Sequence, residues 1–368
     1  MSIDSAVVGA GKVSGVHLSG IQKNPRTNPV AVCDVDESRA RDGAQQYNCR
    51  AYTDVDDLLH SESLDWLHIC TPVQSHFEIA KKGIAAGVPL LIEKPVTETA
   101  EAVETLARLA SENDIPITPV HNHLFRPAVL RSREMIQSGA LGDIRAVDLV
   151  YAGDTRPDAV NRGSWVFDLP GGEFEEGLPH RIYTTLGIGG YPRDRGEIDV
   201  STTLAGDYDG SFDYDTVKLQ YTTEDDVLCS TEVIAGGPPT YQITIYGEDR
   251  IITIDNHLQM IHEIDDEFAG STVGKAKQAF REAGSRLTGV AKNARFVLST
   301  RFSDDWETHK KGDPHYELFD RTAKALENGS TMPVPISSAV WTIRIMEEIR
   351  EAATDTSEPA PLSHADPA

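Results

Sequence analysis

Lys94 is a charged residue placed where an α/β protein can use it for catalysis. It lies between Glu93 and Pro95, directly after the apolar run 89–92. Charged residues and a proline cannot continue a buried strand, so the chain is predicted to leave the sheet at this point. Ligands of open α/β sheets bind beyond the carboxyl ends of the strands, where a lysine can act as an acid, a base or an electrostatic clamp. A solvated charge pair that ends the strand is the alternative.

Glu176 and His180 are the second group that could do chemistry. They are four residues apart, so on a helix they share a face. A carboxylate beside an imidazole can fix its tautomer and raise its basicity, and histidine is the usual general base near neutral pH. An ordinary surface pair has the same spacing. Gly171 and Gly172 would let backbone and ligand approach closely, and Trp165 either lines a sugar site or belongs to the core.

A glycine-rich turn near the N-terminus predicts a dinucleotide site. A strand predicted at 6–8 leads into Gly9, and Gly11 follows two residues later. Ser14, a small residue, occupies the third position of the fingerprint. In the G-x-G-x-x-G/A pattern these glycines make the tight turn and let the backbone approach a pyrophosphate. A second strand at 30–33 ends in Asp34, where an acid receives the ribose hydroxyls. The predicted cofactor is NAD, because the 2′-phosphate of NADP would meet a like charge.

The elements that must position these residues alternate between strand and helix up to residue 120. This alternation predicts a doubly wound parallel sheet of the Rossmann type. The expected strands after the first two are 64–70, 89–92 and 115–120, and the expected helices are 54–59, His76 to about Ala86, and 97–113.

The pattern changes after residue 123, where strand-like runs follow one another and predict a large, mostly antiparallel sheet. These runs are 144–151, 200–204, 216–221, 227–234, 241–246 and 251–254, and the expected helices are 127–139, 174–186, 275–298, 316–327 and 337–353. We therefore expect a dinucleotide-binding domain at 1–122 and a substrate-binding and oligomerisation domain at 123–353. The segment 354–368, rich in Pro, Ser, Asp and Ala, is expected to be disordered.

Composition excludes several classes of function. The net charge of −24 repels nucleic acid and anionic membranes, and no apolar run reaches the roughly 18 residues of a membrane span. The N-terminus starts with a strand, so no signal segment is expected. Four cysteines without C-x-x-C spacing indicate buried thiols in a reducing cytoplasm. His121 and His123 could be a metal pair, but no third ligand is evident, so no metal site is predicted.

These motifs resemble the glucose–fructose oxidoreductase / inositol dehydrogenase (Gfo/Idh/MocA) family over nearly the whole chain. The matching segments are Gly9-Ala10-Gly11 with His17, Asp34, Thr71-Pro72 with His76, Glu93-Lys94-Pro95, Phe125-Arg126-Pro127, and Gly171-Gly172 followed by Glu176 and His180. Glu-Lys-Pro in this context is the most specific part. The resemblance implies a Rossmann domain, an α/β domain on a large open sheet, a nicotinamide cofactor, a polyol or sugar substrate, and a homodimer or homotetramer.

The resemblance also implies roles for individual residues. Lys94 and His180 match the family's catalytic lysine and histidine, and Glu176 falls where the family commonly has Asp. The implied cofactor contacts are Gly9, Gly11, Lys12, Val13, Asp34, Thr71, Pro72, His76, Glu93 and Lys94, and the implied substrate contacts are His123, Arg126, Trp165 and Tyr183. Tyr183 stands where the family often has Asp, and Pro179 directly precedes His180.

The expected function is an NAD-dependent dehydrogenase that acts on a secondary hydroxyl of a sugar, sugar derivative or cyclitol. His180 would take the hydroxyl proton, Lys94 would stabilise the developing alkoxide, and Glu176 would orient His180. A redox-neutral, NAD-using glycosidase-like enzyme and a non-catalytic sugar-binding protein are the alternatives.

Salt should stabilise this protein. Its 58 acidic residues are spread along the chain, which favours adaptation of the whole surface to a high-salt cytoplasm over a single acidic partner-binding face. Because salt screens repulsion between like charges, the melting temperature is expected to rise from dilute buffer to molar potassium chloride. A melting temperature that stays flat or falls over this range would contradict the prediction.

Overall fold

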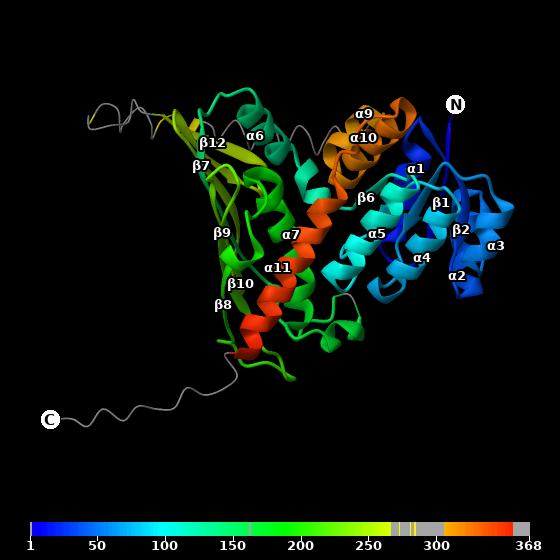
Figure 1. Cartoon of the computed structure of the whole chain (residues 1–368), viewed down its shortest axis with the longest axis horizontal. Coiled ribbons are helices and arrows are strands. Elements are labelled where there is room, and N and C mark those ends of the chain that lie inside the picture. Colours follow the sequence, from blue (N-terminus) through cyan, green and yellow to red (C-terminus); the bar gives the residue numbers. More distant parts are fainter. Residues whose placement is uncertain are drawn as a thin grey trace.

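The structure is a computed structural model, and it describes residues 2–161, 163–265 and 305–355 with the single positions Thr272, Phe280, Ala283 and Gly284. Two six-stranded sheets lie side by side, with helices packed between and around them (Figure 1). The predicted α/β fold, with a parallel Rossmann sheet followed by a mostly antiparallel sheet, is confirmed. The division into domains at residue 122 stays a prediction.

The first sheet is parallel and has the strand order β3-β2-β1-β4-β5-β6. Its strands are β1 (Ile3–Val8), β2 (Thr27–Cys33), β3 (Arg50–Tyr52), β4 (Trp66–Ile69), β5 (Leu90–Ile92) and β6 (Ile117–Pro119). The helices that connect them are α1 (Ser14–Lys23), α2 (Glu37–Tyr47), α3 (Val55–Ser61), α4 (Val73–Ala85) and α5 (Ala100–Glu112). The three-residue strand β3 was not predicted, and α4 begins three residues before the expected start at His76.

The register of this sheet brings the motifs together. Val8 pairs with Cys33 on one side and with Ile69 on the other, and Ile69 pairs with Ile92. The last residues of four strands therefore lie side by side. The glycine-rich turn, the acid after β2, the loop after β4 and the Glu-Lys-Pro segment all leave the sheet at this one edge, where ligands of such sheets bind.

The second sheet has the order β12-β11-β10-β9-β8, and β7 pairs with β10. The strands are β7 (Ile144–Gly153), β8 (Asp199–Thr203), β9 (Thr216–Thr222), β10 (Leu228–Gly247), β11 (Arg250–Asp255) and β12 (Met260–Asp265). The strands predicted at 227–234 and 241–246 are two halves of β10, and both halves pair with β7. Gly236 and Gly237, with φ of 79° and 83°, allow the chain to turn between the halves. Strand β12 was not predicted.

The remaining described helices include η1 (Asn122–Phe125), α6 (Pro127–Gln137), η2 (Ser164–Asp168), α7 (Gly172–Gly189), η3 (Arg195–Glu197), α9 (Trp306–Gly312), α10 (Pro314–Asn328) and α11 (Ile336–Asp355). Helix α9 was not predicted, and the helix expected at 275–298 falls almost wholly outside the described residues. The tail expected from residue 354 begins too early, because Thr354 and Asp355 are the last residues of α11.

Helix α11 joins the two sheets, and Figure 1 shows it running between them. Ala339 and Ile343 belong to the hydrophobic core around β1, β4 and β5. Ile345, Met346 and Ile349 belong to the core between α7 and the second sheet. The N-terminal half of α11 therefore buries apolar side chains in one core and its C-terminal half in the other, which places α7 against the carboxyl edge of the first sheet.

Candidate active site

Lys94 forms the contact on which the site is built. It follows β5, and its peptide bond to Pro95 is cis. Its ammonium group forms an ion pair with the Glu176 carboxylate of α7 and donates a hydrogen bond to the Glu176 carbonyl oxygen at 3.1 Å. Both side chains are only 6% exposed, so the pair holds two opposite charges away from bulk water. The lysine of the first sheet and the helix of the second sheet thus meet in one site.

Glu93 belongs to a chain of buried hydrogen bonds beneath Lys94. One carboxylate oxygen accepts the Lys94 backbone N–H at 3.1 Å, and the other lies 2.9 Å from Nε2 of His17. Burial alone would raise the pKa of Glu93, but the hydrogen bond from His17, together with the nearby positive charge of Lys94, outweighs it and lowers that pKa to about 2. Nδ1 of His17 lies 2.9 Å from Nδ1 of His68.

The protonation of this chain follows from its partners. Burial lowers the pKa of His17, so the imidazole is neutral and its Nε2–H donates to the ionised Glu93. Nδ1 of His17 is then an acceptor, and His68 donates to it through its own Nδ1–H. His17 was expected from the family motif, but His68 was not singled out by sequence reasoning. A histidine inside the apolar strand β4 was its only signal.

His180 is oriented by Tyr183 in this structure. The Tyr183 hydroxyl donates to Oδ1 of Asn122 at 2.8 Å and accepts the backbone N–H of His123 at 3.2 Å. Its single proton is therefore used, and the 2.7 Å contact with Nδ1 of His180 is an N–H donated by the histidine. This tautomer leaves Nε2 as the unprotonated nitrogen. The Glu176 carboxylate pairs with Lys94, and its expected role in orienting His180 stays a prediction.

His121 and His123 lie on either side of this tyrosine network. The His121 ring stacks on Tyr183 with centroids 4.1 Å apart, and its Nδ1 lies 3.0 Å from the Ser338 hydroxyl of α11. The His123 ring stacks on His180 at 4.4 Å. Burial lowers the pKa of His121 to about 3 and holds that of His123 well below its usual value. Both rings are therefore neutral.

Two arginines lie near the stacked rings of His123 and His180. Arg126 donates to Nε2 of His123 at 3.2 Å and to the Asn256 carbonyl oxygen at 3.1 Å. The Arg181 guanidinium lies 3.7 Å from the ring centre of Tyr151 and 4.9 Å from that of Tyr241. Sequence reasoning expected Arg126 at the substrate but missed Arg181.

The glycine-rich turn has the shape that a dinucleotide requires. Gly9 has a φ of 94°, and a Cβ added there would lie 2.7 Å from the backbone of Cys70 and Thr71. A Cβ on Gly11 would meet nothing within 4 Å, so the backbone there is open to a close ligand. The first turn of α1 carries no acidic residue and no side-chain cap. Its free N–H groups therefore fit a pyrophosphate.

Asp34 lies beside this turn. Its carboxylate accepts the Ala10 N–H at 2.7 Å and the Asp36 N–H at 2.9 Å. A carboxylate has about four acceptor positions, so two of them can still receive ribose hydroxyls. The geometry therefore fits the adenosine end of a dinucleotide.

The loop after β4 also lies at the carboxyl edge of the first sheet. His76 is buried, and its ring nitrogens lie 2.7 Å from the Thr71 carbonyl oxygen and 3.0 Å from the Pro95 carbonyl oxygen. It thereby ties the β4 loop to the Glu-Lys-Pro loop. Pro72 caps α4, and Lys12 and Val13 lie on the glycine-rich turn, Val13 at the N-cap of α1.

Trp165 lies in η2, and this residue is 40% exposed. The alternative assignment of Trp165 to the hydrophobic core is therefore wrong.

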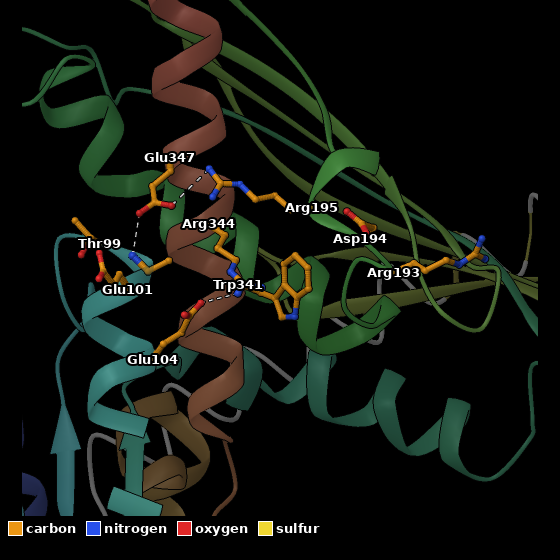
Figure 2. Close-up of a pocket in the computed structure, with 10 residues that line it drawn as sticks. Thr99, Glu101, Glu104, Arg193, Asp194, Arg195, Trp341, Arg344 and Glu347 are labelled. Atoms are coloured by element: carbon orange, nitrogen blue, oxygen red, sulfur yellow. Dashed lines mark hydrogen bonds and ion pairs between the residues drawn. The ribbon is translucent and has the colours of Figure 1, made fainter. Parts of the chain in front are cut away.

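Two surface cavities, of about 700 and 840 Å³, lie away from Lys94, Glu176 and His180. Figure 2 shows the first, between α5, α11 and the segment that follows α7. Two of its arginines pair with carboxylates of the same cavity: Arg195 with Glu347 at 3.8 Å, and Arg344 with Glu104 at 2.5 Å. These ion pairs link α5, α11 and the η3 region.

This fold and site define the class of protein as an NAD(P)-dependent oxidoreductase, and comparisons with known proteins specify the family. A model described as oxidoreductase family, NAD-binding Rossmann fold, matches residues 3–121, and one described as GFO/IDH/MocA C-terminal domain matches residues 129–253. The chain belongs to the Gfo/Idh/MocA oxidoreductase family.

Its relatives share the fold at low sequence identity. The inositol 2-dehydrogenase of Rhizobium meliloti (strain 1021) is 24% identical over 72% of this chain and 79% of its own length. The scyllo-inositol 2-dehydrogenase (NADP(+)) IolW of Bacillus subtilis (strain 168) is 22% identical over 82% of this chain and 80% of its own. The WlbA dehydrogenase from Bordetella pertussis, solved in complex with NADH and UDP-GlcNAcA, superimposes with a TM-score of 0.70 at 17% identity, covering 98% of this chain and 100% of that one.

No helix among the described residues is long and apolar enough to cross a membrane. Within the same residues, no group of three or more His, Cys, Asp or Glu side chains is arranged to hold a metal ion.

Replacing Tyr183 with phenylalanine should lower turnover. The variant Tyr183→Phe removes the acceptor that fixes the Nδ1–H tautomer of His180, so kcat is expected to fall by about 10- to 100-fold. Tyr214→Phe is the matched control, because Tyr214 is also buried and donates to Glu175 at 2.7 Å. Steady-state kinetics on the folded variants measures the effect. A Tyr183→Phe enzyme with wild-type kcat would show that another group orients His180.

Proposed function

We propose that this protein oxidises a secondary hydroxyl of a sugar, sugar derivative or cyclitol with NAD. One observation carries the proposal: the ammonium group of Lys94, which follows β5, contacts Glu176 of α7, one helical turn before His180. A cation from the first sheet's edge and a base from α7 are thereby held on the side where the dinucleotide turn also lies. Bound NAD would supply the hydride acceptor for this chemistry.

The chain's own residues would manage the hydroxyl proton. Nε2 of His180, unprotonated because Nδ1–H is donated to Tyr183, would accept the proton from the substrate hydroxyl. The Lys94 ammonium would stabilise negative charge on the same oxygen in the transition state. Glu176 would act as a positioning residue for Lys94, since the ion pair favours the charged amine and restricts its side chain.

The relatives support a polyhydroxylated substrate. Two of the curated relatives are named for dehydrogenation of inositols, and the WlbA structure contains UDP-GlcNAcA. Because these relatives are only 17–24% identical to this chain, they do not identify its substrate, which must be found by experiment.

A screen of sugars, nucleotide sugars and cyclitols with NAD in high salt tests this function. NADH is expected to accumulate in proportion to the oxidised sugar, and Lys94→Ala should lower kcat at least about 100-fold while NADH binding remains. Lys82→Ala is the control, because Lys82 forms an exposed ion pair with Asp56 at 2.7 Å. Near wild-type turnover by Lys94→Ala would refute the assignment, and glycoside cleavage without NADH accumulation would indicate the redox-neutral reaction.

NAD should be preferred over NADP by at least about tenfold in kcat/KM, roughly 1.4 kcal/mol. The 2′-phosphate would meet the Asp34 carboxylate as a like charge. The nearby cations are engaged on α2, Arg39 with Asp36 at 3.7 Å and Arg41 with Glu37. Asp34→Ser should weaken the preference without changing the chemistry at Lys94. Equal kcat/KM values for the two cofactors in the wild-type enzyme would show that an arginine reaches the phosphate.

A further inference from the structure

Arg181 is a buried cation and Arg126 is a half-buried one, and neither has an acidic partner among the described residues. Arg126 donates only to the neutral groups Asn256 and His123. Arg181 is 7% exposed, and its Nε is buried without a hydrogen-bond partner. A guanidinium stays charged at any physiological pH, so both positive charges persist in the folded protein.

A half-buried arginine elsewhere in this structure does have an acidic partner. Arg350, on α11, donates to the Glu175 carboxylate through two nitrogens at 2.8 and 2.6 Å. The sequence offers 58 acidic residues for such pairing, yet among the described residues none lies within ion-pair distance of Arg126 or Arg181. Because an unpaired charge held away from water is strongly unfavourable, the buried Arg181 and the half-buried Arg126 together point to a negative partner that the described chain does not supply.

Aromatic rings support these cations only in part. Tyr241 lies under both guanidinium groups, 4.9 Å from Arg181 and 5.5 Å from Arg126, and Tyr151 lies 3.7 Å from Arg181. A ring face attracts the charge of a guanidinium but does not satisfy its in-plane N–H fork. Stacking therefore fixes the two planes and leaves N–H groups to bind an anion, which a carboxylate or phosphate does with two parallel bonds.

The arginines are linked to the proposed base through His123 and Tyr241. Arg126 bonds to the edge of His123, whose ring stacks on His180 at 4.4 Å. Arg181 follows His180 in the chain, and Tyr241 contacts Arg181 and also lies 3.3 Å from His123 through its hydroxyl. A substrate whose hydroxyl reaches His180 would therefore place its neighbouring substituents near both guanidinium groups.

We propose that the substrate carries an anionic substituent, a carboxylate or a phosphate, that Arg126 and Arg181 bind beside the carbon undergoing oxidation. This specificity rests on the dehydrogenase function proposed above and narrows its substrate class to sugar acids and sugar phosphates. Arg181 is a binding residue that neither the sequence motifs nor the family match identified. Neutral sugars and cyclitols would leave both charges unpaired in the complex.

Matched pairs of ligands test the charge directly. Hexuronates are compared with their uncharged hexuronamides, and hexose 6-phosphates with the free hexoses, by calorimetric titration into the NADH-bound protein in molar potassium chloride. At least one anion is expected to bind about tenfold or more tightly than its neutral counterpart, equivalent to roughly 1.4 kcal/mol. The two pairs also distinguish a carboxylate from a phosphate. If no anion in either set binds more tightly than its neutral analogue, the proposal is overturned.

Variants assign the effect to the arginine. Arg181→Met keeps the length and apolar stem of the side chain and should reduce the preference for the anion at least about tenfold, while Arg181→Lys should retain part of it. Arg133→Met is the matched control, because Arg133 is also partly buried, and it lines the 840 Å³ cavity that borders the carboxyl end of α7. An unchanged preference in folded Arg181→Met protein would contradict the proposal.

The outcomes separate this inference from the proposed function. Tight binding of acids that depends on Arg181, with no NADH formed from any sugar, would support the anion site and refute the dehydrogenase. Equal oxidation of neutral and acidic sugars by wild-type and Arg181→Met enzymes would support the dehydrogenase and refute the anion site.

Discussion

The buried ion pair between Lys94 and Glu176 is the constraint on which the site depends. Each charge would be costly to bury alone, so β5 and α7 must meet closely enough for the two groups to remain paired. Helix α11 makes this possible by packing its N-terminal half into one hydrophobic core and its C-terminal half into the other. The candidate site therefore lies at the junction of the two sheets, and packing far from Lys94 determines the position of that lysine.

Neutral and charged groups are distributed unevenly around this junction. On the side of the dinucleotide turn, the ionised Glu93 is held by neutral His17, and His68 extends the chain into the core. On the side of the second sheet, His123 stacks on His180 and accepts a hydrogen bond from Arg126, and Arg181 lies over Tyr241. One side thus carries a fully bonded carboxylate, and the other carries positive charge that favours a negative ligand. This polarity would orient a substrate before any reaction takes place.

The sequence predicted what local patterns encode. The glycine turn, Asp34 and the Glu-Lys-Pro segment were recognisable because each follows a short apolar run and the parallel register brings those ends together. The contact between His180 and Tyr183 was not, since Glu176 and Tyr183 are both within one helical turn of His180 and spacing does not distinguish them. The ion pair of Glu176 was not recognisable either, because its partner Lys94 is 82 residues away in the chain. Arg181 was missed because its environment comes from β7 and β10, and the three-residue strand β3 is too short to give a pattern.

The position of one hydrogen atom tests the central claim most directly. Neutron diffraction from deuterium-exchanged crystals of the NADH-bound protein at neutral pH would show which nitrogen of His180 is protonated. The account predicts deuterium on Nδ1, directed at the Tyr183 oxygen, and none on Nε2, with the Tyr183 deuterium directed at Asn122. Deuterium on Nε2 with a bare Nδ1 would contradict it, because His180 would then face the substrate as a donor and could not take the hydroxyl proton.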